Sequence, residues 1–90
     1  MATVKFFGNL RQMAGITTLS LDGKTVGEIL SNLHPHYASV HAALLEEGKL
    51  KPYYKIMVNG MDISLHQGLD TKVSDSDVVA IFPPIAGGTS

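Results

Sequence analysis

The sequence predicts an α+β domain in which a small mixed sheet carries one or two helices packed on one face. Two observations support this class. Short apolar segments at both ends of the chain have the length and composition of strands. Between them, one segment combines a helix-capping signal with apolar residues at helical spacing. With 90 residues, 44% of them hydrophobic, the chain has enough apolar residues for one core. We therefore expect a single domain over residues 1–82 and a flexible tail over residues 83–90.

The first part of the chain predicts two paired strands. Residues 3–7 alternate well enough for a strand, and residues 10–14 form one helical turn before Gly15. Residues 16–21 predict a second strand, with Leu19 and Leu21 on one face. Because the two strands are close in sequence, we expect an antiparallel pair with a wide connection.

Helical signals follow. Thr25 and Glu28 have the spacing of a capping box. The helix should run through residue 33, with Val26, Ile29, Leu30 and Leu33 on its buried face. Gly27 inside it costs about 1 kcal/mol relative to Ala, which suggests that another element packs closely there. Pro35 ends this helix, and residues 36–47 predict a second helix or two broken turns that Gly48 stops.

The second half predicts the remaining strands. Residues 49–52 read as a loop, residues 54–59 as a strand, and Asn59-Gly60 as a tight turn into a short strand over residues 61–65. Leu69 is expected to anchor an irregular stretch to the core. Asp75 and Asp77 are expected to cap a turn rather than to act as paired catalytic carboxylates. The continuous apolar residues 78–82 predict a buried, central strand.

Composition excludes several classes of function. A net charge of −1 without a basic stripe argues against nucleic-acid and membrane-surface binding. The absence of cysteine excludes disulfides, thiolate metal sites and a cysteine nucleophile. The four histidines lack a recognised ligand spacing, so we expect them on the surface and expect no bound metal or cofactor. Without a signal-peptide pattern or an apolar run near ~18 residues, a cytoplasmic location is expected.

The last eight residues are the most informative. Pro83 and Pro84 lack a backbone N–H and fix φ, so they end the strand and begin a stiff, extended arm. Gly87 and Gly88 lack a Cβ and fit a channel too narrow for other residues. From Pro83 to Gly88 the arm reaches roughly 20 Å. These features predict a domain that delivers its C-terminus into another protein's active site.

The order of the predicted elements favours a β-grasp (ubiquitin-like) roll, in which a helix covers one face of a mixed sheet. The chain also resembles the MoaD/ThiS family of ubiquitin-like sulfur carriers. This resemblance rests on four segments in the family's order: residues 4–15 with their Phe-Phe opening, Val58-Asn59-Gly60, residues 75–84 ending in the diproline, and residues 85–88 with the glycine pair.

The resemblance implies a mechanism. An E1-like adenylating enzyme uses ATP to activate the carboxylate of Gly88, and sulfur transfer converts the acyl-adenylate into a thiocarboxylate. The large subunit of molybdopterin synthase then uses this sulfur to make molybdopterin, with this chain as the small subunit. Thr89 and Ser90 follow Gly88. Either a processing peptidase removes them, or they are a cloning remnant, or this member does not carry sulfur.

The resemblance also implies a docking surface. Phe7 and Phe82 match aromatic positions of an apolar patch on the exposed sheet face, and Met61 is a third candidate. Because neighbours on a strand face opposite sides, Phe6 and Ile81 should then point into the core.

Two alternatives stay open. In the first, the chain is a protein modifier of the archaeal or Urm1 type, whose activated tail forms isopeptide bonds with lysines. In the second, it is a ubiquitin-like interaction module with an inert tail. Arg11 matches a family position and is either a structural partner of a loop carboxylate or a contact with another protein. The pathway that receives the sulfur is not identified by the sequence.

Overall fold

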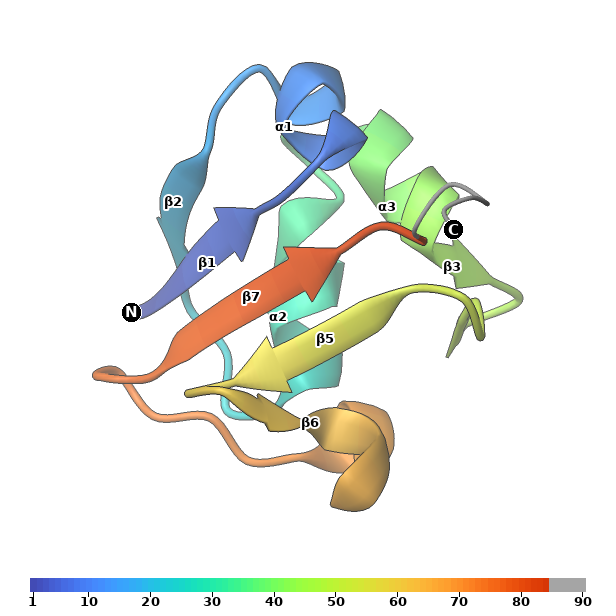
Figure 1. Cartoon of the computed structure of the whole chain (residues 1–90). Helices are drawn as coiled ribbons and strands as arrows, with labels where there is room; N and C mark the ends of the chain where they lie inside the picture. The colour runs from blue at the N-terminus through green and yellow to red at the C-terminus, as the bar shows by residue number, and fades with distance from the viewer. Residues whose placement is uncertain (85–90) are drawn as a thin grey trace.

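The computed structural model describes residues 1–84, in which five strands form one mixed sheet (Figure 1). The strand order is β2-β1-β7-β5-β6. The bounds are β1 Ala2–Phe6, β2 Thr18–Leu21, β5 Lys55–Val58, β6 Met61–Asp62 and β7 Val78–Phe82. The central strands β1 and β7 are parallel, and the other neighbours are antiparallel. The predicted antiparallel pairing of the first two strands and the central position of the last strand are therefore confirmed.

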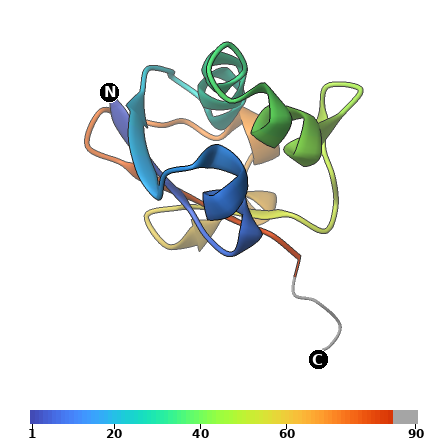
Figure 2. The ribbon, with the colours of Figure 1, turned by 90° about the horizontal axis from the view of Figure 1, so that it is seen from above.

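Three helices lie on one face of this sheet: α1 Asn9–Ala14, α2 Val26–Leu33 and α3 Ala38–Leu44 (Figures 1 and 2). Helix α2 begins as predicted, because the Thr25 hydroxyl accepts the backbone N–H of Glu28 at 3.2 Å. The Glu28 carboxylate accepts the N–H of Lys24 at 2.9 Å and so satisfies a second donor before the helix. Gly27 lies against Leu69, whose carbonyl oxygen would be 3.3 Å from an added Cβ. The close packing predicted at Gly27 is thus confirmed.

Replacing Thr25 with alanine should lower the free energy of unfolding by about 1 kcal/mol, because the N–H of Glu28 loses its acceptor. Urea unfolding measures this change. Ser31→Ala, at an exposed position of the same helix, serves as the control. Equal stability of the Thr25 and Ser31 variants would contradict the capping role.

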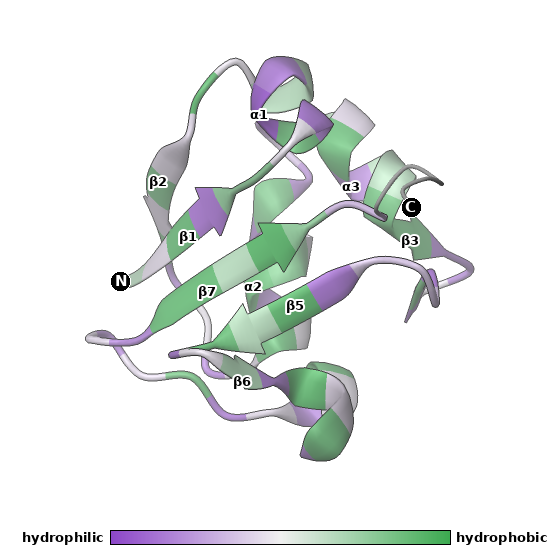
Figure 3. Cartoon of the chain, viewed as in Figure 1, coloured by the Kyte–Doolittle hydropathy of each residue, from purple (hydrophilic) through white to green (hydrophobic). Residues whose placement is uncertain are grey.

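The core forms between the helices and the inner face of the sheet. Burial alternates along the strands, as expected for side chains that point to opposite faces. The residues below 2% exposure are Phe6, Leu10, Ile29, Leu30, Leu33, Leu44, Ile56, Ile81, Val4, Val26, Val40 and Val79. In β7 only Val79 and Ile81 are buried, and Val78, Ala80 and Phe82 are half-buried on the other face. The last strand is therefore central as predicted but buried on its inner face only, because among residues 1–84 no helix covers the outer face (Figures 2 and 3).

Three segments differ from the sequence prediction. The second helix ends at Leu44, and β3 (Leu45–Glu46) pairs with β4 (Lys49–Leu50) in a hairpin where a loop was expected. Glu47 and Gly48 form its tight turn with φ of 54° and 78°, so Gly48 serves a hairpin rather than a helix end. The predicted strand over residues 61–65 stops at Asp62. The short 3-10 helix η1 (Ile63–Leu65) follows, because the Asp62 carboxylate accepts the N–H of Ser64 at 2.9 Å.

Hydrogen bonds join the turn after β5 to the start of β7. Asn59 and Gly60 both have positive φ, as the predicted tight turn requires. The Asn59 side chain accepts the N–H of Val78 at 2.9 Å and donates to the Asp77 carboxylate at 2.8 Å. Asp77 also accepts the N–H of Ser74 at 2.8 Å. The predicted turn-capping role of Asp77 is confirmed, and Asp75 pairs with the N-terminal ammonium group at 3.1 Å.

These hydrogen bonds make stability depend on pH. The Ser74 N–H and then the Asn59 amide hold the pKa of Asp77 below its usual value of about 3.9. A depressed pKa in the folded state contributes stability above about pH 4, and this is lost as the pH falls through the folded pKa. Asp77→Asn should be less stable than the parent at pH 7, and the gap should shrink at pH 3. Urea unfolding at both pH values checks this. The pKa of Asp62 is also lowered. Because Asp62 is present in both proteins, its contribution cancels in the difference between their stabilities. A gap independent of pH would contradict the assignment.

The histidines make one contact with each other in the described part of the chain. His34 and His41 meet edge to face with ring centroids 4.8 Å apart, and burial, followed by the charge of His34, lowers the pKa of His41. Among residues 1–84, no three metal-ligating side chains come together. No helix in this described part is long and apolar enough to cross a bilayer.

Candidate functional site

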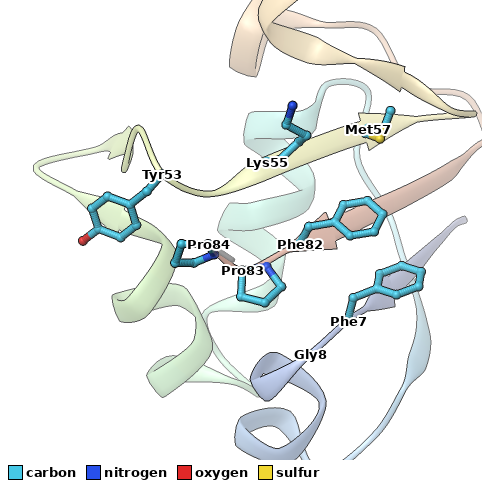
Figure 4. Close-up of a pocket in the computed structure, with 8 residues that line it drawn as sticks. All are labelled: Phe7, Gly8, Tyr53, Lys55, Met57, Phe82, Pro83 and Pro84. Atoms are coloured by element: carbon cyan, nitrogen blue, oxygen red, sulfur yellow. The ribbon is translucent and has the colours of Figure 1, made fainter. Parts of the chain in front are cut away.

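An apolar hollow lies on the outer face of the sheet, where β7 ends (Figure 4). Its volume is about 730 Å³, and it is lined by Phe7, Gly8, Tyr53, Lys55, Met57, Phe82, Pro83 and Pro84. These residues come from the end of β1, the start of β5 and the end of β7, which are neighbours in the sheet. We call this surface the tail-base patch, because the chain leaves the sheet through Pro83 and Pro84 at its border.

Phe7 and Phe82 form the centre of the tail-base patch. Their rings are stacked, with centroids 4.4 Å apart and planes 13° from parallel. The N–H of Phe7 donates to the carbonyl of Ile81 at 3.1 Å, so the β1–β7 ladder sets the distance between the two rings. Phe6 and Ile81, their chain neighbours, are buried to 1% and 0% exposure. The structure therefore places all four side chains as the sequence predicted, and the partner-binding role of Phe7 and Phe82 stays a prediction.

Met57 extends the patch across β5 and was missed by the sequence reasoning. It lies between the buried residues Ile56 and Val58, so strand alternation alone directs its side chain to the outer face. Tyr53, 56% exposed, continues the apolar surface along the loop before β5. The sequence could have predicted Met57, because it is an apolar residue at an outward-facing position of the strand next to the last strand.

One ion pair borders the patch. The Lys55 ammonium lies 3.1 Å from the Asp62 carboxylate on the neighbouring strand β6. The Ser64 N–H, followed by the Ser64 hydroxyl and Lys55, holds the pKa of Asp62 below its usual value. Because Asp62 is charged at neutral pH, the pair gives the apolar surface a fixed polar rim.

Met61 does not join the tail-base patch. It pairs with Val58 across β5 and β6, and residues directly opposite in an antiparallel pair share one face of the sheet. Since Val58 is buried, that face is the one the helices cover. Met61, at 56% exposure, lines a separate hollow with His66, Gln67 and Lys72. Its predicted partner contact, if made, belongs to a second surface.

Pro83 has a close neighbour where the chain leaves the sheet. Gly8 follows β1 with φ of 61° and ψ of −140°, and a Cβ at Gly8 would lie 2.6 Å from Cγ of Pro83. Pro83 is half-buried and Pro84 is exposed. The predicted reactive positions Gly87 and Gly88 lie outside the described residues, as does most of the predicted flexible tail.

Arg11 has no carboxylate partner in the described part of the chain. The two salt bridges within residues 1–84 join the N-terminus to Asp75 and Lys55 to Asp62. The structural pairing of Arg11 with a loop carboxylate was therefore not found there.

The described part of the patch has the composition of a protein–protein interface. Its surface is aromatic and aliphatic, the kind that forms the centre of protein–protein interfaces. Among the residues that line it, Lys55 and Tyr53 alone carry titratable side chains, and Lys55 is held by Asp62. Among the described residues, this apolar surface lies next to the point where the tail begins.

Comparisons with known proteins agree with this geometry. Residues 4–88 match the ThiS family. The chain is 33% identical over 88 residues to small archaeal modifier protein 3 of Haloferax volcanii, covering 94% of this chain and 96% of the relative. It is 35% identical over 77 residues to the sulfur carrier protein CysO of Mycobacterium tuberculosis, covering 82% and 83%.

Solved structures give the same picture. In the BexX/CysO complex of Amycolatopsis orientalis, a chain that is 32% identical superposes with a TM-score of 0.90, covering 98% of this chain and 100% of that one. A putative molybdopterin converting factor, subunit 1, from Pyrococcus furiosus is 27% identical with a TM-score of 0.71, covering 93% and 97%. The predicted ubiquitin-like β-grasp fold is thereby confirmed.

Proposed function

Because the chain belongs to the ThiS family of ubiquitin-like sulfur carriers, we propose that Gly88 carries the transferred sulfur as a thiocarboxylate. The observation that supports this most is the tail-base patch, an apolar docking surface at the point where the chain leaves the sheet toward Gly87-Gly88. The family match also extends to Gly88. A partner that binds the patch receives the tail in a fixed orientation, which replaces the free diffusion of a sulfur donor.

The proposed chemistry takes place on the tail carboxylate. An E1-like enzyme transfers AMP from ATP to the Gly88 carboxylate and releases pyrophosphate, which gives the acyl carbon a good leaving group. A hydrosulfide ion then attacks this carbon, so that a C–S bond forms, the C–O bond to AMP breaks and AMP leaves with the electron pair. The product is a thiocarboxylate, which attacks the final acceptor. In this proposal the activating enzyme, and not this chain, binds the ATP.

A free Gly88 carboxylate requires cleavage of the bond between Gly88 and Thr89. We propose that a peptidase makes this cut and thereby controls when the carrier becomes active. In the described part of the chain, the buried apolar residues all lie between Ala2 and Ile81, so a chain that ends at Gly88 keeps this core.

Intact mass measurement tests the proposal. The chain ending at Gly88 is incubated with the adenylating enzyme of its source organism, ATP and a sulfide donor. We expect the mass increment of one oxygen replaced by sulfur, and none for the chain that retains Thr89-Ser90. A chain ending at Gly88 that stays unmodified, while the enzyme modifies its own known carrier, would overturn the proposal.

We place the sulfur acceptor in molybdopterin synthesis, with the large subunit of molybdopterin synthase as partner. The similarity to a putative molybdopterin converting factor subunit supports this choice. Mixing the thiocarboxylated chain with that large subunit and the pterin precursor should form molybdopterin and regenerate the carboxylate. If the thiocarboxylated chain gives its sulfur only to a different acceptor enzyme, the molybdopterin assignment is wrong and the chain belongs to the pathway of that enzyme.

Protein modification is the second candidate, favoured by the similarity to small archaeal modifier protein 3. The same acyl-adenylate then reacts with a lysine amine and forms an isopeptide bond. This role predicts conjugates in the source organism in which Gly88 is linked to a lysine. The conjugates should disappear when Gly88 is deleted. The two roles share activation and differ only in the nucleophile.

A further inference from the structure

The contact between Gly8 and Pro83 fixes the chain at the point where the tail begins. An added Cβ at Gly8 would lie 2.6 Å from Cγ and 3.3 Å from Cδ of Pro83. Both are ring atoms, which cannot rotate away as the end of a flexible side chain does. The Gly8 backbone with φ of 61° and ψ of −140° is also close to a region that is essentially restricted to glycine.

Hydrogen bonds and packing on both sides hold the backbone of Gly8 and of Pro83 in place, so neither residue can move away to relieve the clash. Before Gly8, the N–H of Phe7 donates to Ile81 and holds β1 against β7. After it, the Gly8 carbonyl accepts the N–H of Arg11 at 3.2 Å, and the fully buried Leu10 anchors helix α1 to the core. Pro83 follows β7 directly and has a restricted φ. The place of the Pro83 ring against Gly8 therefore sets the direction in which Pro84 leaves the sheet.

We propose that Gly8 is a positioning residue of the sulfur-transfer reaction, which acts through Pro83 to aim the tail. This inference rests on the proposed carrier function. It separates two tasks within the tail-base patch, because the aromatic rings at its centre bind the partner and the Gly8–Pro83 contact at its border sets where the carboxylate arrives. A displaced carboxylate reacts slowly even when the complex forms normally, since small errors in position cost large factors in rate.

The test uses carriers ending at Gly88 as substrates of the adenylating enzyme, with kcat and KM for the carrier measured by ATP–pyrophosphate exchange. Gly8→Ala should lower kcat at least ~10-fold with KM changed less than ~3-fold. Gly15→Ala is the matched control, because Gly15 also has positive φ, 79°, but nothing lies within 4 Å of its Cβ position. Gly15 lies in the left-handed region with ψ of 4°, so its alanine variant carries milder backbone strain and no clash and should keep kcat near the parent value.

A double variant separates the clash from the strain. In a Pro83→Ala background the ring atoms are gone, so adding Gly8→Ala should lower kcat by less than ~3-fold. A Gly8→Ala effect equal in both backgrounds would assign the loss to backbone strain and overturn the proposal. Equal kcat for Gly8→Ala and Gly15→Ala would also overturn it.

Two further measurements cover the remaining outcomes. If Gly8→Ala fails to fold by circular dichroism, Pro83→Ala alone should still lower kcat at unchanged KM, and its failure to do so would overturn the positioning role. An inactive parent chain would overturn the carrier function itself. In the parent chain we expect nuclear Overhauser effects between the Gly8 α protons and the Pro83 ring, whose absence would remove the contact on which the inference rests.

Discussion

Replacing Phe7 with aspartate should lower kcat/KM for adenylation of the chain about 100-fold, which corresponds to about 3 kcal/mol of lost binding. Phe7 is 36% exposed in the free domain and stacks on Phe82 at the centre of the tail-base patch. When a partner covers this surface, the new carboxylate loses its water without gaining a hydrogen-bond partner. ATP–pyrophosphate exchange with the adenylating enzyme measures the effect, which should appear mainly in KM.

Two matched variants make the result specific. Leu65→Asp introduces the same charge at an apolar residue that is 80% exposed on η1, outside the patch, and should react like the parent. Phe7→Leu keeps an apolar side chain and should lose no more than ~10-fold. Met61→Asp decides the prediction that Met61 contacts a partner, since a loss there would add a second surface to the interface. If Phe7→Asp and Leu65→Asp behave alike, the patch is not the docking site.

Replacing Phe6 with alanine should lower the free energy of unfolding by about 3–5 kcal/mol. Phe6 is 1% exposed and packs in the core, with its ring centroid 6.4 Å from that of Tyr37. The missing ring leaves a cavity that the helices and the sheet cannot close. Domains of this size have about 5–15 kcal/mol of stability in total, so this one side chain accounts for a large fraction of it.

The neighbouring residue provides the control. Phe7→Ala removes an equally large ring from the outer face and should cost at most about 1–2 kcal/mol, since part of that ring already contacts water. Urea unfolding of both variants measures the difference. A loss of stability at Phe7 as large as at Phe6 would mean that the outer face is part of the folding core and would weaken its interpretation as a docking surface.

Local signals explain what the sequence predicted correctly. Helix α2 depends on the Thr25 cap and on apolar spacing within eight residues, and both can be read directly. The family resemblance placed Phe7 and Phe82 on the exposed sheet face, and alternation along the strands then placed Phe6 and Ile81 in the core. The β3–β4 hairpin was missed because Glu47-Gly48 is a weaker turn signal than Asn-Gly and lies next to a helical pattern.

Long-range contacts explain what was missed at the site. The contact of Gly8 with Pro83 joins residues far apart in sequence, and only the parallel register of β1 and β7 brings them together. In the same way, the Lys55–Asp62 pair depends on the register between β5 and β6. Met57 is different, since alternation along β5 could have predicted its outward position.

The parallel pairing of β1 with β7 also bears on how the chain is made. The first and the last strands are neighbours at the centre of the sheet, so the largest loop in the fold must close before the core is complete. During synthesis this ladder cannot form until residue 82 has left the ribosome. A prematurely terminated chain therefore lacks the sheet centre, half of the aromatic stack and the tail together. We therefore expect chains that terminate before β7 to remain unfolded, so that premature termination does not produce a folded domain without its tail.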